Sequence, residues 1–400
     1  MTFSAIAFLL IVTVSCAQKD NKNNIGNFCD ATLKRASDQL SLLEQDAEKE
    51  QKIPRTVSHG KISWAEDIFD WTEGFFPGSM WYNFENTGDS VWLNKADHFQ
   101  TLYADQRFLP YYHDLGFVFW CSYGNGYRLT KNEKYKQILI DAGNTLVTRY
   151  DSTVRCIRSW DVNKGWQSKR NWQFPVIIDN MMNLELLFEL SKITGDPKYR
   201  SVAVSHANTT LKNHFRNDYS SYHVVDYDTI TGDVRSKQTA QGYAHESAWA
   251  RGQAWGLYGF TMCFRYTNDS TYLKHANSIA RFILNNPQIP SDHVPYWDYN
   301  APKIPDEPRD VSAAAITASA LIELSSYTNG KYLNDAIDIL TSLEQNYQPA
   351  VGTNNHFILN HSVGSIPHNH EIDVPLNYAD YYYIEALVRL KKSYPNPKAN

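Results

Sequence analysis

Hydrophobic positions recur along the chain at the spacing of amphipathic helices, in segments that polar turns separate. Asp, Asn or Ser stands near the start of most segments, as expected of residues that cap helices. Strand-like runs such as Tyr222 to Tyr227 are short, and strands and helices do not alternate regularly. The pattern predicts an all-α protein of about twelve helices. Their expected starts lie near Asn27, Glu73, Asp89, Asp114, Asn132, Asp179, Asp196, Ser247, Asp269, Val311, Asn329 and Asn377.

A weak internal repeat joins these segments in pairs. A Thr is followed by an aromatic residue and then by an Ala, and each copy lies after one apolar segment and before the next. Asp, Asn and Gly inside the copies supply the chemistry that ends one helix and begins another. The repeat therefore predicts the turns of helical hairpins. Its copies are Thr87-Trp92-Ala96, Thr194-Tyr199-Ala203, Thr267-Tyr272-Ala276, the shorter Thr328-Tyr332-Ala336, and Thr130-Tyr135 with Leu139 in place of Ala.

Six such hairpins favour a closed toroid, the (α/α)6 barrel, over residues 28–400 as one catalytic domain. An open solenoid of hairpins is the alternative. In a toroid the inner helices converge on an axial pocket. Four stretches rich in Pro, Gly, Asn, Asp and aromatic residues are expected to wall that pocket at one end. They are 151–177, 215–243, 287–310 and 346–376.

The N-terminus predicts an export signal over residues 1–17 and a polar tether over 18–27. The apolar run from Ala5 to Val14 is too short to span a bilayer stably. Cleavage after Ala17 and lipid attachment at Cys16 both fit the small residues there. We expect an exported bacterial protein, either periplasmic or anchored to the membrane by lipid.

Composition narrows the function classes. At 42% apolar residues the chain can bury a large core, and a net charge of −5 argues against nucleic acid or an anionic membrane as partner. The 11 Trp and 26 Tyr exceed what a core needs and are typical of proteins that handle sugars. Cys29, Cys121, Cys156 and Cys263 form no CxxC pair, so we expect buried small side chains rather than a zinc site or disulfides.

The stretch from Gln241 to Phe260 combines aromatic rings, amides, a guanidinium and glycines. Arg251 and Trp255 lie four positions apart on one helical face, as do Trp249 and Gln253 on another. Rings can stack on a sugar, amides can pair with hydroxyls, and a guanidinium can meet a carboxylate. The stretch predicts a pocket for a flat, hydroxyl-rich anion, although core packing also explains the tryptophans. Its glycines, Gly252, Gly256 and Gly259, predict close helix packing or close approach of a ligand.

Asp114 and Asp179 each stand where a helix is expected to begin. Helix capping alone would explain either one. Both, however, adjoin strongly aromatic or apolar sequence, and in a toroid both would face the same cavity. Paired carboxylates in an apolar pocket can share one proton, as acid/base catalysis requires. We therefore predict that they carry the chemistry.

Motifs for other chemistries are missing. The sequence contains no P-loop, GxSxG, GxGxxG or HExxH pattern, so nucleotide-binding, lipase-type and zincin mechanisms lack support. His368 and His370 have a spacing that is weak for metal ligation. We expect neither a metal nor a cofactor.

The chain resembles the unsaturated glucuronyl hydrolases of glycoside hydrolase family 88. The resemblance runs from about residue 30 to 392 and implies an (α/α)6 barrel. These enzymes act after polysaccharide lyases and remove the 4,5-unsaturated uronic acid from the nonreducing end, by hydrating its double bond. The motifs that carry it are WTEGFFPGSMW at 71–81, HDLGF at 113–117, IDNMMNL at 178–184, SAWARGQAWGLYG at 247–259 and VPLNYADYYYIEAL at 374–387.

The resemblance implies roles for individual residues. Asp179 corresponds to the general acid/base and Asp114 to its supporting carboxylate. The substrate-binding residues of the family correspond to His223, Gln241, Trp249, Arg251 and Trp255.

One departure concerns sulfate. Family members that act on sulfated glycosaminoglycans carry S-x-x-S-x-K in the late loop. This chain keeps Ser362 and Ser365 as expected substrate contacts but has Pro367 in place of Lys, with His368 beside it. Unsulfated glycosaminoglycan, gellan-like and ulvan-type oligosaccharides stay open as substrates.

Three alternatives follow from the same residues. An unsaturated rhamnogalacturonyl hydrolase would share the fold and the chemistry. A surface glycan-binding lipoprotein without catalysis would gain nothing from buried carboxylates. An α/α-barrel sugar epimerase would be expected to place two or more histidines in the cavity.

Overall fold

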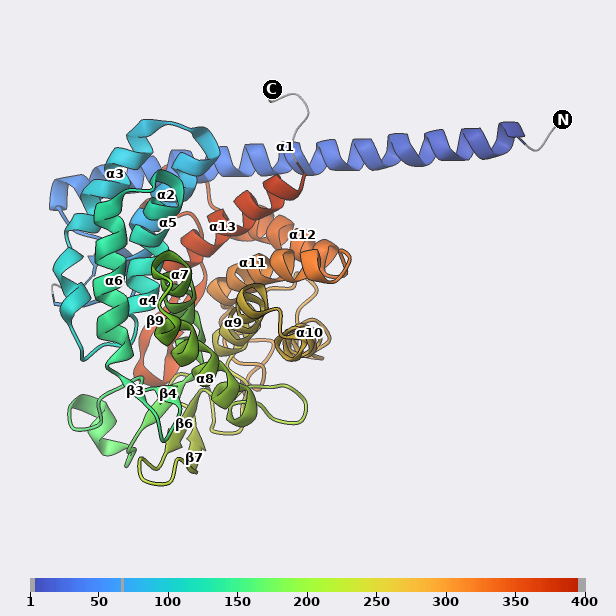
Figure 1. Cartoon of the computed structure of the whole chain (residues 1–400). Coiled ribbons are helices and arrows are strands. Elements are labelled where there is room, and N and C mark those ends of the chain that lie inside the picture. Colours follow the sequence, from blue (N-terminus) through green and yellow to red (C-terminus); the bar gives the residue numbers. More distant parts are fainter. Residues whose placement is uncertain (1–3, 66–67, 395–400) are drawn as a thin grey trace.

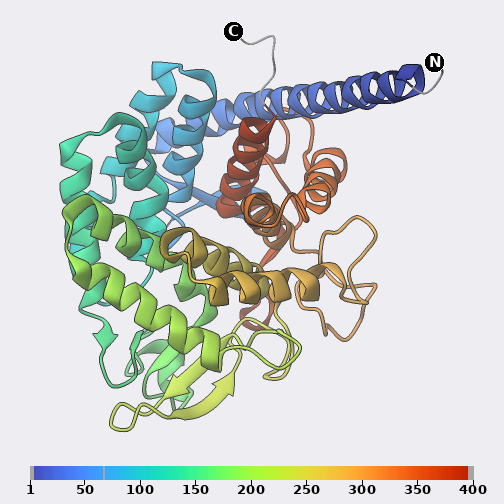
Figure 2. The ribbon, with the colours of Figure 1, turned by 45° about the vertical axis from the view of Figure 1, so that its right-hand side comes forward.

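Paired helices form a closed ring in the computed structural model, which describes residues 4–65 and 68–394 (Figures 1 and 2). The last inner helix packs against both its predecessor and the first inner helix, so the ring closes and the open solenoid is excluded. The predicted (α/α)6 barrel is confirmed. The inner ring consists of α2 (Phe75–Thr87), α4 (Leu115–Phe119) continued by a π-helical turn and α5 (Asn125–Thr130), α7 (Leu184–Thr194), α9 (Ala250–Thr267), α11 (Val311–Tyr327) and α13 (Asn377–Ser393). The outer ring consists of α1 (Ser4–Glu50), α3 (Ser90–Thr101), α6 (Glu133–Val147), α8 (Pro197–Asn213), α10 (Ser270–Leu284) and α12 (Leu333–Ser342).

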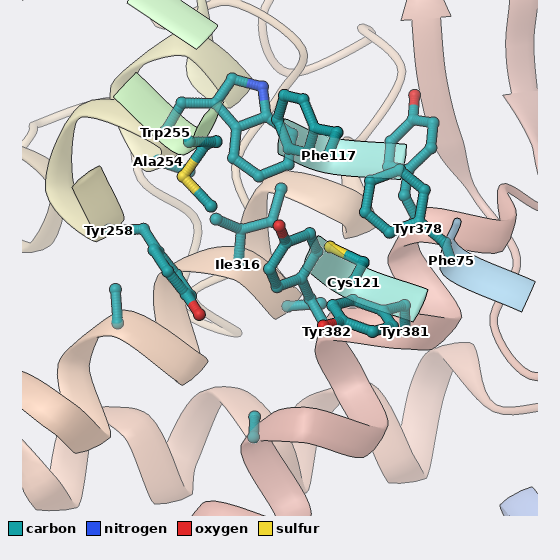
Figure 3. Packing of buried hydrophobic residues seen from close by; sticks show 14 of the residues in the cluster. Phe75, Phe117, Cys121, Ala254, Trp255, Tyr258, Ile316, Tyr378, Tyr381 and Tyr382 are labelled. Atoms are coloured by element: carbon teal, nitrogen blue, oxygen red, sulfur yellow. The ribbon is translucent and has the colours of Figure 1, made fainter. Parts of the chain in front are cut away.

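Burial separates the two rings as their sequences predict. Inner helices such as α9 and α11 are buried on nearly every side. The outer helix α10 instead buries one face through Tyr272, Ala276, Ile279 and Ile283, which recur at helical spacing. Figure 3 shows part of the packed core, in which the ring centroids of Phe117 and Trp255 lie 5.1 Å apart.

The internal repeat is confirmed as the turn between an inner and an outer helix. In the turn from α9 to α10, the Thr267 hydroxyl donates to the carbonyl of Cys263 (2.7 Å) and accepts from the N–H of Asp269 (3.1 Å). The Asp269 carboxylate then accepts from the N–H of Thr271 (2.8 Å) and so caps α10. Equivalent bonds occur at Thr87, Thr130 and Thr194.

The aromatic position of the repeat links neighbouring outer helices. The Tyr272 hydroxyl of α10 donates to Asn208 Oδ1 of α8 at 2.7 Å. Three other copies make the same kind of bond one helix along the ring: Tyr135 to Asp97 at 2.5 Å, Tyr199 to Asn144 at 2.8 Å and Tyr332 to Asn277 at 2.9 Å. One sequence repeat thus builds both the hairpin turns and the contacts between hairpins.

Short antiparallel strands lie in the long loops, with β3, β4, β6 and β7 gathered below the ring in Figure 1. The strand expected near Tyr222 to Tyr227 is β6. Each pair is a hairpin except for one three-stranded sheet, β5-β6-β7. The strands are β1 (Pro54–Ser58), β2 (Lys61–Trp64), β3 (Tyr150–Asp151), β4 (Cys156–Ile157), β5 (Pro175–Ile177), β6 (Val224–Tyr227), β7 (Val234–Gln238), β8 (Ser362–Ser365) and β9 (His370–Val374).

The first helix departs from expectation, because α1 begins at Ser4 rather than near Asn27. No Gly or Pro interrupts the sequence before Gly26, so nothing local stops the helix earlier. The N-terminal part of α1 extends beyond the ring in Figure 1. Export, the tether and lipid attachment at Cys16 stay predictions. Within the described ranges, no helix has the length and apolar character needed to cross a bilayer.

The cysteines that lie in the barrel behave as expected. Cys29, Cys121, Cys156 and Cys263 are buried thiols without disulfide bonds. Burial raises the pKa of each thiol, so the four side chains serve as small apolar groups.

The contact between neighbouring outer helices can be tested with Tyr272→Phe. Loss of the hydroxyl removes the bond to Asn208 while the buried ring stays, so we expect the free energy of unfolding to fall by about 1 kcal/mol in denaturant titrations. Tyr243→Phe, at an exposed ring, is the control and should change it little. Equal effects of the two changes would contradict the role of the repeat.

Candidate active site

A cavity of ≈ 220 Å³ opens at the loop end of the barrel. Its walls combine aromatic rings, two carboxyls, histidines and an amide, which suits a ligand with flat faces and many hydroxyls. The lining residues are Trp71, His113, Asp114, Phe117, Trp160, Trp166, Ile177, Asp179, Ala240, Gln241, Ser365, His368 and His370. The structure therefore brings together the two aspartates that the sequence singled out.

Asp114 precedes α4, but its side chain makes no capping bond. Its Oδ1 instead accepts a hydrogen bond from Asn183 Nδ2 at 3.3 Å and lies 3.2 Å from His113 Nε2. Asp89, Asp196 and Asp269 do cap their helices. Capping explains those aspartates and does not explain Asp114.

Asp179 lies in the first turn of the 3₁₀-helix η4 (Ile178–Asn183), which connects β5 to α7. Its Oδ2 is buried and has no hydrogen-bond partner among the described residues. His223 Nε2 faces it at 3.6 Å. A buried carboxyl oxygen without a partner is costly to a fold, so its retention is typical of a site that awaits a ligand.

The backbone fixes the tautomer of His223. Its Nδ1 accepts hydrogen bonds from the N–H groups of Ala240 (3.1 Å) and Gln241 (3.2 Å). Burial and the charge of Arg251 hold the pKa of His223 well below its usual value, so the ring is neutral. The proton therefore resides on Nε2, which presents a donor beside Asp179.

Burial sets the protonation of both aspartates. It raises the pKa of Asp114 to about 7, helped by the nearby charge of Asp179 and opposed by the hydrogen bond from Asn183. Burial also raises the pKa of Asp179 to about 7, opposed by Arg251 and by the indole N–H of Trp255. Groups that titrate near neutrality are suited to acid/base catalysis.

Glycines allow two helices to press on the turn that holds Asp179. A Cβ on Gly259 of α9 would lie 2.6 Å from Met181 Cβ, and one on Gly116 of α4 would lie 2.3 Å from Asn183 Cα. Real side chains do not approach so closely, so both positions require glycine. Gly259 of α9 thus serves close packing against the turn that carries Asp179.

The other predicted substrate contacts divide into residues that line the cavity and residues, such as Trp249 and Trp255, that are not among its described lining residues. Gln241 and Ser365 line the cavity. Trp255 packs on Phe117, and Trp249 stacks on the Arg251 guanidinium at 4.5 Å.

Arg251 and Ser362 are not among the described residues that line the cavity. The Arg251 guanidinium donates to Asp310 (3.2 Å), to the Gly364 carbonyl (2.7 Å) and to the Val363 carbonyl. Ser362 is fully buried. Through these contacts Arg251 holds strand β8 of the β8–β9 hairpin against α9. Direct recognition of substrate by Arg251, Trp249, Trp255 and Ser362 stays a prediction.

Sequence reasoning missed several residues that line the cavity or bond to Asp114. His113 adjoins Asp114 in the sequence, which was the one available signal. Trp160 and Trp166 come from an irregular loop, and Asn183 appeared only as part of a motif. Asn183 matters because its Oδ1 accepts from Phe117 N (2.9 Å) while its amide donates to Asp114, so it ties α4 to η4.

No cluster of three or more metal-ligating side chains occurs in the part of the chain that the structure describes.

Comparison with known proteins places this site in context. The family model described as Glycosyl Hydrolase Family 88 matches residues 46–390. A protein of Formosa agariphila named unsaturated glucuronyl hydrolase is 52% identical over 323 residues, which cover 80% of each chain. A crystal structure of an unsaturated glucuronyl hydrolase specific for heparin is 45% identical, with 92% of this chain and 98% of that chain covered and a TM-score of 0.87. The unsaturated glucuronyl hydrolase of Bacillus sp. GL1, responsible for the degradation of glycosaminoglycan, is 30% identical, with 90% and 97% covered and a TM-score of 0.83.

The raised pKa of Asp179 can be tested, independently of catalysis, through the dependence of protein stability on pH. The stabilisation from its protonated form is complete below the unfolded pKa of about 4 and is lost as the pH rises through about 7. Asp179→Asn avoids this loss, so the melting temperature of the variant relative to the native protein should rise between pH 4 and pH 8. In the control Asp269→Asn the difference should stay nearly constant over this range, because capping lowers the pKa of Asp269 and the stability that depends on it changes below about pH 4. A pH-independent difference for Asp179→Asn would contradict the assignment.

Proposed function

The chain belongs to glycoside hydrolase family 88, and from this premise we propose how its site works as an unsaturated glucuronyl hydrolase. The enzyme removes a 4,5-unsaturated uronic acid from the nonreducing end of lyase-generated oligosaccharides. The observation that carries the mechanism is a pair of aspartates in one cavity, Asp179 buried and Asp114 partly buried, neither of which caps a helix.

The proton of the pair resides on Asp179. Both carboxyls have a pKa of about 7, and two adjacent charges oppose each other, so near neutrality the pair holds about one proton. The Asn183 amide donates to Asp114 at 3.3 Å and favours its ionised form. The N–H groups of Trp255 and His223 face Asp179, but Asp179 Oδ2 accepts no hydrogen bond among the described residues. Asp179 is thus the acid, and ionised Asp114 keeps it protonated.

Hydration of the double bond then follows. Asp179 gives its proton to C4 of the unsaturated ring, and oxocarbenium character develops at C5. A water molecule attacks C5 while the Asp179 carboxylate takes a proton from it, which restores the acid. The resulting hemiketal opens its ring, and the bond to the remaining glycan breaks. No displacement occurs at the anomeric carbon, so the carboxylate-separation rule for retaining and inverting enzymes does not apply.

The remaining polar groups position the substrate. Neutral His223 presents Nε2–H beside Asp179, and the Gln241 amide lies at the cavity wall. Ionised Asp114 accepts from ring hydroxyls. Arg251 acts from behind the wall, where it holds the β8 carbonyls and lowers the pKa of Asp179.

The alternative functions lose support. The relatives named above are glucuronyl hydrolases, which disfavours a rhamnogalacturonyl hydrolase and a non-catalytic binder. His113, His368 and His370 do line the cavity, as expected for an epimerase. Burial holds the pKa of His113 well below its usual value, however, and family membership decides for hydrolysis.

Exchange of the acid should abolish turnover. We expect Asp179→Asn to lower kcat by at least about 10³-fold, because the amide cannot protonate C4. Loss of the ultraviolet absorbance of the C4=C5 bond measures the rate. Glu73→Gln is the matched control, since Glu73 is another buried carboxyl whose pKa burial raises to about 8, and it should retain most activity. Near-native turnover by Asp179→Asn would refute the proposal.

Sulfate preference depends on position 367. Ser365 Oγ and His368 Nδ1 are hydrogen bonded at 2.7 Å, and burial and the charge of Arg170 lower the pKa of His368, so neither residue supplies a cation at neutral pH. We expect no gain in kcat/KM from a 6-sulfate on the second sugar. Pro367→Lys should raise kcat/KM for that sulfated disaccharide about tenfold, as a new charge-assisted bond would. Pro367→Gln separates charge from loss of the ring, and an equal gain in it would contradict the argument.

A further inference from the structure

A second, larger cavity adjoins the catalytic one. Its volume is ≈ 490 Å³, more than twice the ≈ 220 Å³ of the inner cavity. The two share one wall, made of Trp71, His113, Asp114, Trp160 and Trp166. If the inner cavity holds one uronate ring, the outer cavity has room for about two more sugars.

The far wall of this outer cavity is aromatic. Phe69 and Tyr112 stack with ring centroids 3.9 Å apart. Tyr111 beside them is 58% exposed, and the Lys164 ammonium lies 5.1 Å above its ring. An exposed ring at the edge of a cavity is a platform on which the face of a sugar can stack.

Apart from Asp114 on the shared wall, the charged groups that line the outer cavity are held in ion pairs with one exception. Arg55 is held by Asp70 and Glu371, each at 2.6 Å. Asp161 is held by Arg149 (3.1 Å) and Arg158 (3.2 Å).

Lys164 is the exception among the described residues of this cavity. It makes no ion pair, and its ammonium lies over Tyr111 at the mouth. Away from the shared wall, the charge available to a ligand is therefore a single cation beside a stacking platform.

We propose that the outer cavity binds the second and third sugars of the oligosaccharide, with Tyr111 stacked on the third ring and Lys164 paired with its carboxylate. The inference rests on the proposed function, because it takes the inner cavity as the place of the unsaturated uronate. In a polymer that alternates uronate with a second sugar, the third residue is again a uronate. Tyr111 and Lys164 are then determinants of chain length and charge, at a distance from the reacting atoms.

Kinetics on a disaccharide and a tetrasaccharide from one lyase digest test this proposal. The native enzyme should have a lower KM for the tetrasaccharide. Lys164→Gln and Tyr111→Ala should each reduce the ratio of the two KM values about threefold, as expected from loss of an exposed ion pair or a stacking contact. Lys331→Gln is the matched control, because Lys331 also lies over a tyrosine ring, at 4.8 Å from Tyr332, and lines neither cavity.

Reduction of the carboxyl of the third sugar to an alcohol should remove most of the tetrasaccharide advantage in the native enzyme and leave Lys164→Gln unaffected. The proposal is overturned by equal KM values for the two lengths, by variants that leave their ratio unchanged, or by a carboxyl-reduced tetrasaccharide that keeps its full advantage. A native enzyme that does not turn over the disaccharide would instead refute the proposed function.

Discussion

The burial of one carboxyl, Asp179, is the constraint on which the rest of the site depends. Desolvation raises its pKa to about 7, which makes a carboxylic acid available near neutral pH. That burial exists because α4 and α9 press on η4 at Gly116 and Gly259, where no side chain fits. The pKa of Asp179 therefore depends on close helix packing, and a methyl group at either glycine would change both the packing and the pKa.

Asp114 lines the same cavity as Asp179, but the two carboxyls have different hydrogen-bond partners. Asn183 donates to Asp114, whereas Asp179 faces the neutral His223. The difference is one formed hydrogen bond, and in the proposed mechanism that bond leaves the shared proton on Asp179. Asn183 also binds the N–H of Phe117, so the residue that polarises the pair is itself held by the barrel.

The sequence predicted the barrel well because its signals are local. Helix starts fell within a few residues of those observed for all but α1, and the repeat at Thr267 and Tyr272 specified both a turn and a contact between helices. The aspartates were found because their apolar surroundings were visible nearby in the chain. Arg251 was placed less well, since its partners in β8 lie more than a hundred residues away and no periodicity reports them.

The architecture separates what must be rigid from what can vary. Outer helices are joined by bonds that repeat from hairpin to hairpin, such as Tyr199 to Asn144, and these depend little on the long loops. The loops at one end are then free to differ in sequence while the two aspartates keep their positions on inner elements. Trp160, Trp166 and the β8–β9 hairpin, which wall the cavity, belong to those loops. The chemistry can thus stay constant within such a barrel while the polysaccharide that it serves changes.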